Sequence, residues 1–261
     1  MAPPYNISFI GAGNVAEALC TGLKAEGQKI LSVASRGGDS ARQLAKSAGA
    51  VWTRDNTITE NCDIVIVAVN DISVAEVAKS IRLPGKTVIV HTAGSVSLSA
   101  LGRTTHAGVL YPLQTFSKGF SPDLRKVPFF IEATDKSTLK VLHNLGMLIG
   151  AGAWECDSER RRYLHLAAVF TNNFSNFMMT VGEVIASRAG FDPALLKPLM
   201  EETARKAIVA GPSSSQTGPA VRHDALTLKN HVELLSFSPE YRELYEQISL
   251  LITEYYKKSN T

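Results

Sequence analysis

The sequence is poor in cysteine and has no long hydrophobic run. Its 261 residues contain 3 cysteines, Cys20, Cys62 and Cys156, which form neither a CxxC pair nor a metal-ligand spacing. Sparse, unpaired thiols are typical of a reducing compartment, so we expect a cytoplasmic protein. Polar residues interrupt every apolar stretch before it reaches membrane-spanning length, and the opening MAPPYN lacks the basic and apolar parts of a signal peptide. We therefore expect neither a membrane partner nor a secretory leader.

Charge of one sign is also scarce. The formal net charge is +3, and no stripe of arginine and lysine with interleaved aromatics is present, so nucleic acid is not an expected partner. We find no internal repeat and no low-complexity tract. With 45% hydrophobic and 20% charged residues, the chain has the composition of a globular protein with a proper core. Its length suits one large or two modest domains.

A glycine-rich turn stands near the start of the chain. The apolar residues Ile7–Ile10 predict a strand, and helical spacing begins after Asn14. Between them lie Gly11, Ala12 and Gly13, followed by Asn14, Val15 and Ala16, which read as GxGxxA. Glycine allows a tight bend and a close backbone approach, and the helix start favours a pyrophosphate. This strand–turn–helix context predicts a dinucleotide site; the alternative is an ordinary tight turn.

Strands and helices alternate as far as residue 155, and only helical periods follow. The predicted strands include the nearly continuous apolar run Cys62–Val69, which is typical of a strand buried on both faces of a parallel sheet. We predict an α/β fold with a doubly wound, mostly parallel sheet (Rossmann) over residues 1–155. An all-α domain should follow over residues 156–261.

The helical half has clear start signals. Asp192, Asp224 and Ser238 each precede a helical period and are good N-caps. Before them, the segment 158–189 predicts one long helix that ends at Gly190. We also expect a helix to begin in the stretch TGPAVRHD, with Thr217 as its N-cap. The start of this helix could bind a substrate carboxylate; the alternative is that Thr217 is only a structural cap.

The end of the second predicted strand favours NADP(H). An acidic residue usually holds the ribose of NAD about 20 residues past the glycines. Here Ser35 and Arg36 occupy that place, and a hydroxyl with a guanidinium suits a 2′-phosphate. The alternative is that Arg36 is a solvated charge and that Asp39 reaches the ribose.

Two further strand ends should complete the groove, because α/β sheets bind ligands at the carboxyl ends of their strands. One is Val69, Asn70 and Asp71, and the other begins with His91 and Thr92 and runs to Ser95. We expect the second to lie beside the nicotinamide and the substrate. The alternative is a plain turn with side-chain-to-backbone hydrogen bonds.

A polar stripe crosses an otherwise apolar helix. The segment YLHLAAVFTNNFSNFMM should be a central buried helix, yet it carries His165, Asn172, Asn173 and Asn176. At α-helical spacing, Asn172 and Asn176 each fall within about 20° of His165. We predict that His165 delivers the proton that accompanies a hydride and that the two asparagines orient substrate. The alternative is that the stripe bonds helix to helix or subunit to subunit.

The six-residue stretch Tyr111–Phe116 gives weaker signals. It follows a predicted strand, and Tyr111 or Gln114 should line the pocket there.

These motifs together resemble one oxidoreductase family along the whole chain. They are the opening GAGNVA, HTAGSVSLSAL, YPLQTF, HLAAVFTNNF, LLKPLMEET and TGPAVRHDA. The family pairs a Rossmann-like domain with an uncharacterised helical C-terminal domain and is similar to pyrroline-5-carboxylate reductase, ketopantoate reductase and the 6-phosphogluconate dehydrogenase group. The resemblance implies a cofactor in the first domain, substrate at the domain junction and a homodimer formed through the helical domain.

Three features depart from these relatives. Relatives often carry histidine in place of Tyr111 and glycine in place of His223. The hydroxyacid dehydrogenases also use a lysine with an asparagine four residues on, and this helix has no such pair. We predict an NADP(H)-dependent oxidoreductase acting on a small carbonyl, imine or hydroxyacid, with Ser95 near the substrate. The alternative is a redox-silent NADP(H)-binding regulator.

Overall fold

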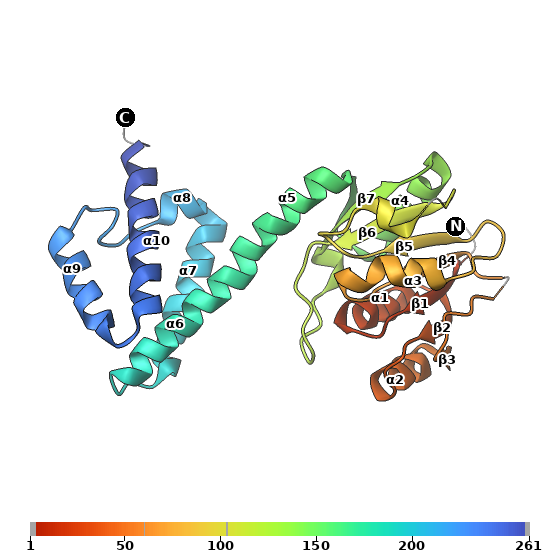
Figure 1. The fold of residues 1–261 in the computed structure, drawn as a ribbon, viewed down its shortest axis with the longest axis horizontal. Coiled ribbons are helices and arrows are strands. Elements are labelled where there is room, and N and C mark those ends of the chain that lie inside the picture. Colours follow the sequence, from red (N-terminus) through yellow and green to blue (C-terminus); the bar gives the residue numbers. More distant parts are fainter. Residues whose placement is uncertain (1–3, 60, 103, 259–261) are drawn as a thin grey trace. The chain divides into compact units, whose positions relative to one another are not determined.

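The computed structural model describes residues 4–59, 61–102 and 104–258 (Figure 1). The first three residues of the MAPPYN segment lie outside this part of the chain. Contacts divide the chain into two compact units, residues 1–173 and 174–261. The predicted boundary at residue 155 instead marks the end of the sheet, and the next helix belongs to the first unit.

The first unit is a Rossmann-like α/β domain built on one eight-stranded sheet in the order β3-β2-β1-β4-β5-β6-β7-β8. Neighbouring strands are parallel except β6 and β7, which are antiparallel. The order reverses at β1, so a crevice opens at the carboxyl ends of β1 and β4. The strands are β1 (Asn6–Ile10), β2 (Lys29–Ala34), β3 (Val51–Thr53), β4 (Ile64–Val67), β5 (Val88–His91), β6 (Ala107–Pro112), β7 (Pro128–Ala133) and β8 (Gly152–Glu155).

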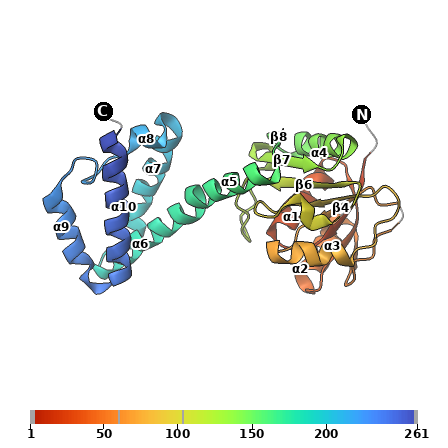
Figure 2. The ribbon, with the colours of Figure 1, turned by 45° about the horizontal axis from the view of Figure 1, so that its top comes forward.

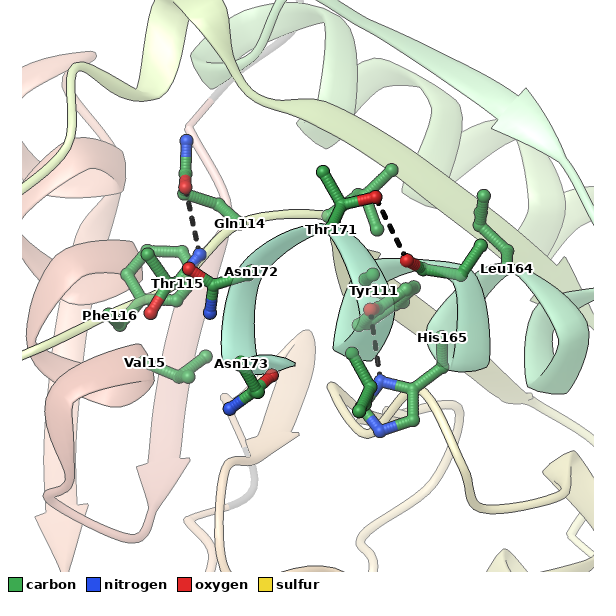
Figure 3. A pocket seen from close by; sticks show the side chains of 14 residues that line it. Val15, Tyr111, Gln114, Thr115, Phe116, Leu164, His165, Thr171, Asn172 and Asn173 are labelled. Carbon is green, nitrogen blue, oxygen red and sulfur yellow. Dashed lines mark hydrogen bonds between the residues drawn. The ribbon is translucent and has the colours of Figure 1, made fainter. Parts of the chain in front are cut away.

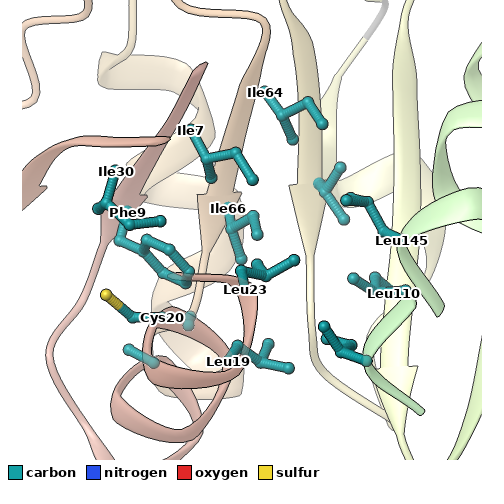
Figure 4. Close-up of a cluster of buried hydrophobic side chains, with 14 of the residues drawn as sticks. Ile7, Phe9, Leu19, Cys20, Leu23, Ile30, Ile64, Ile66, Leu110 and Leu145 are labelled. Atoms are coloured by element: carbon teal, nitrogen blue, oxygen red, sulfur yellow. The ribbon is translucent and has the colours of Figure 1, made fainter. Parts of the chain in front are cut away.

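Helices cover both faces of this sheet. Helices α1 (Asn14–Ala25), α2 (Asp39–Ala48) and α4 (Lys136–Ile149) contribute to one apolar cluster, shown in part in Figure 4. Helix α3 (Val74–Ser80) contributes to a second cluster. Successive side chains of a strand point to opposite faces, so Ile64 and Ile66 join the first cluster while Val65 and Val67 join the second. This explains why β4 is apolar at every position.

One strand was not predicted. β8 is short, and its exposed residues Trp154 and Glu155 break the apolar pattern. It pairs with β7 from Pro128↔Gly152 to Ile131↔Glu155. This strand therefore forms because its backbone pairs with the buried strand β7. Its side chains do not alternate between apolar and polar, so the sequence gives no strand signal there.

The three cysteines are free and buried. Burial raises the pKa of the Cys20 thiol to about 11, so the group stays protonated. They act as small apolar residues, as their spacing predicts.

The second unit, considered by itself, is helical (Figure 2). The predicted caps are confirmed: Asp192 accepts a hydrogen bond from the N–H of Ala194, and Asp224 accepts one from the N–H of Thr227. The predicted helix in 217–224 is wrong, since a turn runs there and His223 has φ +56°. The helices of the second unit are α6 (Ser175–Arg188), α7 (Lys197–Ala210), α8 (Pro212–Ser215), α9 (Ala225–Leu234) and α10 (Pro239–Lys258).

The long helix predicted over 158–189 is interrupted. It consists of α5 (Ser158–Ala168), a π-helical segment (Val169–Phe174) and α6. It is also not buried within a single chain, because Tyr163 and Leu166 are 71% and 51% exposed. The rotation of 100° per residue therefore does not apply between His165 and Asn176, because the π-helical hydrogen bonds from i to i+5 widen the turn between them.

No helix in the described ranges is long and apolar enough to span a membrane. The same ranges contain no cluster of three or more residues suited to a metal ion.

Candidate functional site

The glycine turn after β1 has the geometry that a dinucleotide requires. Gly11 has φ +107°, and a Cβ there would collide with the backbone oxygen of Ala68 at the end of β4. By contrast, a Cβ on Gly13 would meet no atom within 4 Å. Gly13 is the N-cap of α1 and provides no side-chain cap, so the first N–H groups of the helix point to an open space. The turn thus offers a bare helix N-terminus to an anion.

A groove of about 470 Å³ extends from this turn along the strand ends. Seven of the predicted cofactor residues line it: Gly11, Ala12, Gly13, Ser35, Arg36, Val69 and Asn70. The alternative ribose contact Asp39 does not line it; this residue begins α2.

Arg54 also lines the groove, although it is not among the residues predicted from the sequence. It follows directly after β3, so the signal was a cation at the carboxyl end of a strand adjacent to β2. Its guanidinium carbon lies 5.6 Å from the ring centroid of Trp52, while that of Arg42 lies 4.5 Å from the same centroid. Arg36 and Arg54 together give this end of the groove two cations.

The loop after β6 is tied to the dinucleotide turn. The side-chain amide of Asn14 donates a hydrogen bond to the Phe116 carbonyl at 3.0 Å. Asn14 was predicted as a cofactor contact; it does not line the groove, and its hydrogen bond holds the loop in place. A second pocket, of about 550 Å³, lies where this loop, Val15 and the α5 region meet (Figure 3).

None of the residues that line this second pocket carries a formal charge except His165 when protonated. Its polar members are Tyr111, Gln114, Thr115, His165, Thr171, Asn172 and Asn173. Tyr111, Gln114, His165 and Asn172 were singled out from the sequence, and Val15 was predicted as a cofactor contact. Asn173 was assigned to another face, but the wider π-helical turn brings both asparagines to the pocket.

His165 and Tyr111 contact each other. The Tyr111 hydroxyl lies 3.2 Å from His165 Nδ1, and the two rings meet edge to face, 6.0 Å apart at 72°. Burial raises the pKa of Tyr111 to about 12. The hydroxyl therefore keeps its proton at neutral pH.

Ser95 and Asp71 are joined by a short hydrogen bond from the Ser95 hydroxyl to the carboxylate. The structure thus links the strand ends of β4 and β5, as expected for two segments that share one edge of the sheet. Neither residue lines the two pockets described above.

His91 needs a correction. It was predicted as a cofactor contact, but it is 0% exposed, and Nδ1 accepts a hydrogen bond from the Ala93 N–H. Burial, with Arg161 nearby, lowers its pKa to about 4, so the ring is neutral. His91 shapes the loop from inside the domain. Thr92 is half-buried and lines neither pocket.

Arg161 is a functional candidate that the sequence did not reveal. It is 0% exposed, and its guanidinium donates to Glu132 at 2.5 Å and to the Val96 carbonyl at 2.6 Å. Ser158, at the start of α5, donates to the same carboxylate at 2.7 Å. These bonds fix the first turn of α5 to β7 and to the loop after β5. A buried arginine among the surface charges of a helix leaves no sequence signal.

Asn176 belongs to the second unit, on α6, and is exposed. Its carbonyl accepts a hydrogen bond from the Thr180 hydroxyl. The pocket beside His165 does not include it. Its role toward substrate stays a prediction.

Both the sheet-forming part and the helical part of this chain resemble known proteins. Residues 6–94 match the family model described as NADP oxidoreductase, coenzyme F420-dependent, and residues 127–252 match a domain of unknown function, DUF2520. A solved structure from Bacteroides fragilis, described as a putative NADP oxidoreductase, is 36% identical over 96% of this chain and 98% of its own, with a TM-score of 0.88. No curated protein matches the sequence.

Two more distant structures share the fold. A protein from Thermotoga maritima is 24% identical, with 98% of this chain and 100% of its own covered and a TM-score of 0.76. A pyrroline-5-carboxylate reductase from Coxiella burnetii is 21% identical, with 98% of each chain covered and a TM-score of 0.57.

Proposed function

The chain belongs to this family of NADP oxidoreductases, and we propose that it transfers a hydride between NADP(H) and a small carbonyl, imine or hydroxyacid. The observation that carries the proposal is the pair of pockets at the turn after β1. One runs along the glycine turn and two arginines, and the other brings His165 together with amide and hydroxyl groups.

The first groove supports the phosphate-bearing nucleotide in particular. Gly11 and Gly13 leave room for the pyrophosphate at the start of α1. Ser35, Arg36 and Arg54 supply a hydroxyl and two guanidinium groups where the 2′-phosphate of NADP would lie. Asp39 does not line the groove. Asp55 does, and its Oδ1 accepts hydrogen bonds from the Thr53 hydroxyl and the Thr57 N–H. The donor set therefore favours NADP(H) over NAD(H).

The second pocket supplies what the hydride transfer needs from the protein. The nicotinamide carries the hydride, and the protein binds, orients and supplies the proton. His165 is the proton donor, while Asn172 and Asn173 hold the polar group of the substrate with amide N–H or C=O. Apart from the proton donor His165, the lining holds no cation, and burying a carboxylate without a paired cation is costly, so the pocket favours a neutral carbonyl or imine.

Turnover tests the proposal directly. NADPH absorbance would be followed with two cyclic imines that differ only by a carboxylate, 1-pyrroline and 1-pyrroline-5-carboxylate, and with small ketones and aldehydes. Oxidation of NADPH by any member is expected, with His165→Gln at least about tenfold slower because a positioned proton donor is lost. Tight NADPH binding with no turnover on the whole set would favour the regulator.

Calorimetric titration tests the choice of cofactor. Arg36→Ala and Arg54→Ala should each weaken NADPH about tenfold to a hundredfold and leave NADH unchanged, since a charge-assisted hydrogen bond contributes about 1.5–3 kcal/mol. Arg82→Ala, an exposed arginine outside the groove, is the control. Equal loss for NADPH and NADH would remove the arginines from the 2′-phosphate site.

We further propose a homodimer formed through the helical unit. Within its described residues only Ala220 and Leu235 are buried apolar side chains, while Ile208 and Leu251 are 84% and 63% exposed. A helical unit with so small a core and such apolar faces requires a partner surface. Light scattering should give a dimer that Ile208→Glu or Leu251→Glu weakens and that the control Lys229→Glu leaves intact. A monomeric wild-type protein would refute the dimer.

A further inference from the structure

The second pocket contains a side-chain pair whose geometry decides how His165 works. The Tyr111 hydroxyl is 3.2 Å from Nδ1 of the imidazole (Figure 3). Within the described part of the chain, no residue is hydrogen-bonded to Nε2. The two nitrogens of the ring are therefore not equivalent. Nδ1 is taken by the protein, and Nε2 remains for a ligand.

A third element holds the pair from the side. A Cβ built on Gly94 would lie 2.8 Å from His165 Nδ1 and 2.8 Å from two ring carbons of Tyr111. These distances are shorter than real Cβ contacts allow, so the loop after β5 packs directly on both rings only because residue 94 is glycine. The imidazole is thus enclosed by Tyr111 on β6 and by the backbone of Gly94.

The chemistry of the tyrosine fixes the direction of the hydrogen bond. Tyr111 is 8% exposed, and burial, with Asp71 nearby, raises its pKa to about 12 although Arg161 opposes the shift. A buried hydroxyl proton needs an acceptor, and among the described residues only His165 Nδ1 lies within hydrogen-bond distance. When the imidazole is neutral, the hydroxyl donates to Nδ1 and the ring proton must be on Nε2.

The position of the ring along α5 is fixed as well. Arg161 is held by Glu132 and by the Val96 carbonyl, and it precedes His165 by four residues on the same face of the helix. The ion pair fixes the position of α5 along its axis and its rotation about that axis. Tyr111 then sets the rotation of the imidazole about its own bond.

We propose that Tyr111 is the positioning residue of His165: it holds Nδ1 so that the pocket always meets the Nε2–H donor. This inference rests on the proposed function only where it speaks of substrate; the state of the imidazole can be measured without any. When the ring is protonated, Nε2–H gives its proton to the carbonyl oxygen or imine nitrogen. The neutral ring that is left keeps Nδ1–H, which donates to the Tyr111 oxygen until solvent returns a proton to Nε2. Tyr111 lines the same pocket and keeps its own proton throughout.

Nuclear magnetic resonance of protein labelled with 15N-histidine tests the proposal. Long-range 1H–15N spectra distinguish the two neutral tautomers, and the His165→Gln variant identifies the signals of residue 165 among the 6 histidines. We expect His165 to be entirely in the Nε2–H form in the wild-type protein at a pH where the ring is neutral. Tyr111→Phe, which keeps the ring and removes the hydroxyl, should shift both nitrogen signals toward the averages of a mixed population.

Tyr163→Phe is the matched control, because Tyr163 is on the same helix but 71% exposed. Its spectrum should equal that of the wild type. A wild-type ring with the proton on Nδ1, or identical nitrogen signals in the wild type and Tyr111→Phe, would overturn the proposal. Gly94→Ala provides a second perturbation, since its Cβ must push the two rings apart and so should reproduce the Tyr111→Phe spectrum.

Kinetics then separate this inference from the proposed function. With a substrate in hand, Tyr111→Phe should lower kcat about tenfold without changing the Kd of NADPH, because a misdirected donor slows only the proton-dependent step. An unchanged kcat would refute the positioning role. If no substrate is reduced, the proposed function fails, and the spectra alone decide the state of the ring.

Discussion

The buried ion pair between Arg161 and Glu132 allows a quantitative prediction. The Arg161 side chain is 0% exposed and that of Glu132 is 20% exposed, with 2.5 Å between Nη1 and Oε2. Arg161→Met keeps much of the side-chain volume but leaves the carboxylate without its cation. Removing one partner of a buried pair costs about 3–5 kcal/mol, and the partial exposure of Glu132 favours the lower end of that range.

The assay is urea unfolding at fixed protein concentration, followed by tryptophan fluorescence. Trp52 and Trp154, the 2 tryptophans of the chain, lie on β3 and β8, so the signal reports on the sheet that carries the pair. We expect Arg161→Met to lower the free energy of unfolding by about 3 kcal/mol. The exposed neighbour Arg160→Met is the control and should change it by less than about 0.5 kcal/mol.

A double-mutant cycle separates the pair from its surroundings. Arg161→Met combined with Glu132→Leu removes both charges, so the double variant should recover a large part of the loss. If Arg161→Met stays within about 1 kcal/mol of Arg160→Met, the pair does not hold α5 in place. The position of His165 along α5 would then not depend on this ion pair.

Three further results are expected. Gly11→Ala should unfold or aggregate the protein, because its Cβ meets a backbone carbonyl of the sheet. Gly13→Ala should keep the circular dichroism spectrum and melting temperature of the wild type but bind NADPH more weakly. Equal melting temperatures for the two variants would contradict this. Because the pKa of His91 is about 4 rather than 6.5, folding favours the neutral ring. The free energy of unfolding should therefore fall by up to about 3 kcal/mol as the pH drops from 6.5 toward 4. In urea titrations His91→Asn should flatten this pH dependence, and an equal pH dependence would refute the assignment. Asn172→Ala and Asn173→Ala should each slow NADPH oxidation about twofold to tenfold, the effect of one neutral hydrogen bond; no effect of either would remove the amides from the substrate site.

Local chemistry in the sequence determined the fold class and the first groove. Apolar runs of strand length, helical spacing and the glycine turn are local signals, so the doubly wound, mostly parallel sheet and the groove residues Gly11, Gly13, Ser35 and Arg36 could be predicted. Side-chain caps such as Asp224 are equally local. Each depends on residues within about one turn of each other.

Tertiary structure decided what depends on distant contacts. The π-helical segment Val169–Phe174 brings Asn173 to the pocket, although α-helical spacing placed it elsewhere. The predicted ligand His91 is buried, because it lies on a central strand covered on both faces.

The same holds for the pairs that build the site. Arg161 meets Glu132 across 29 residues and His165 meets Tyr111 across 54, and no local pattern of residues encodes such a meeting. Local residue patterns therefore predict which backbone segments form and which strand ends line the groove after β1. Only the packing of α5 against β6 and β7 decided which side chains face one another there, since those contacts join residues that neither periodicity nor capping relates.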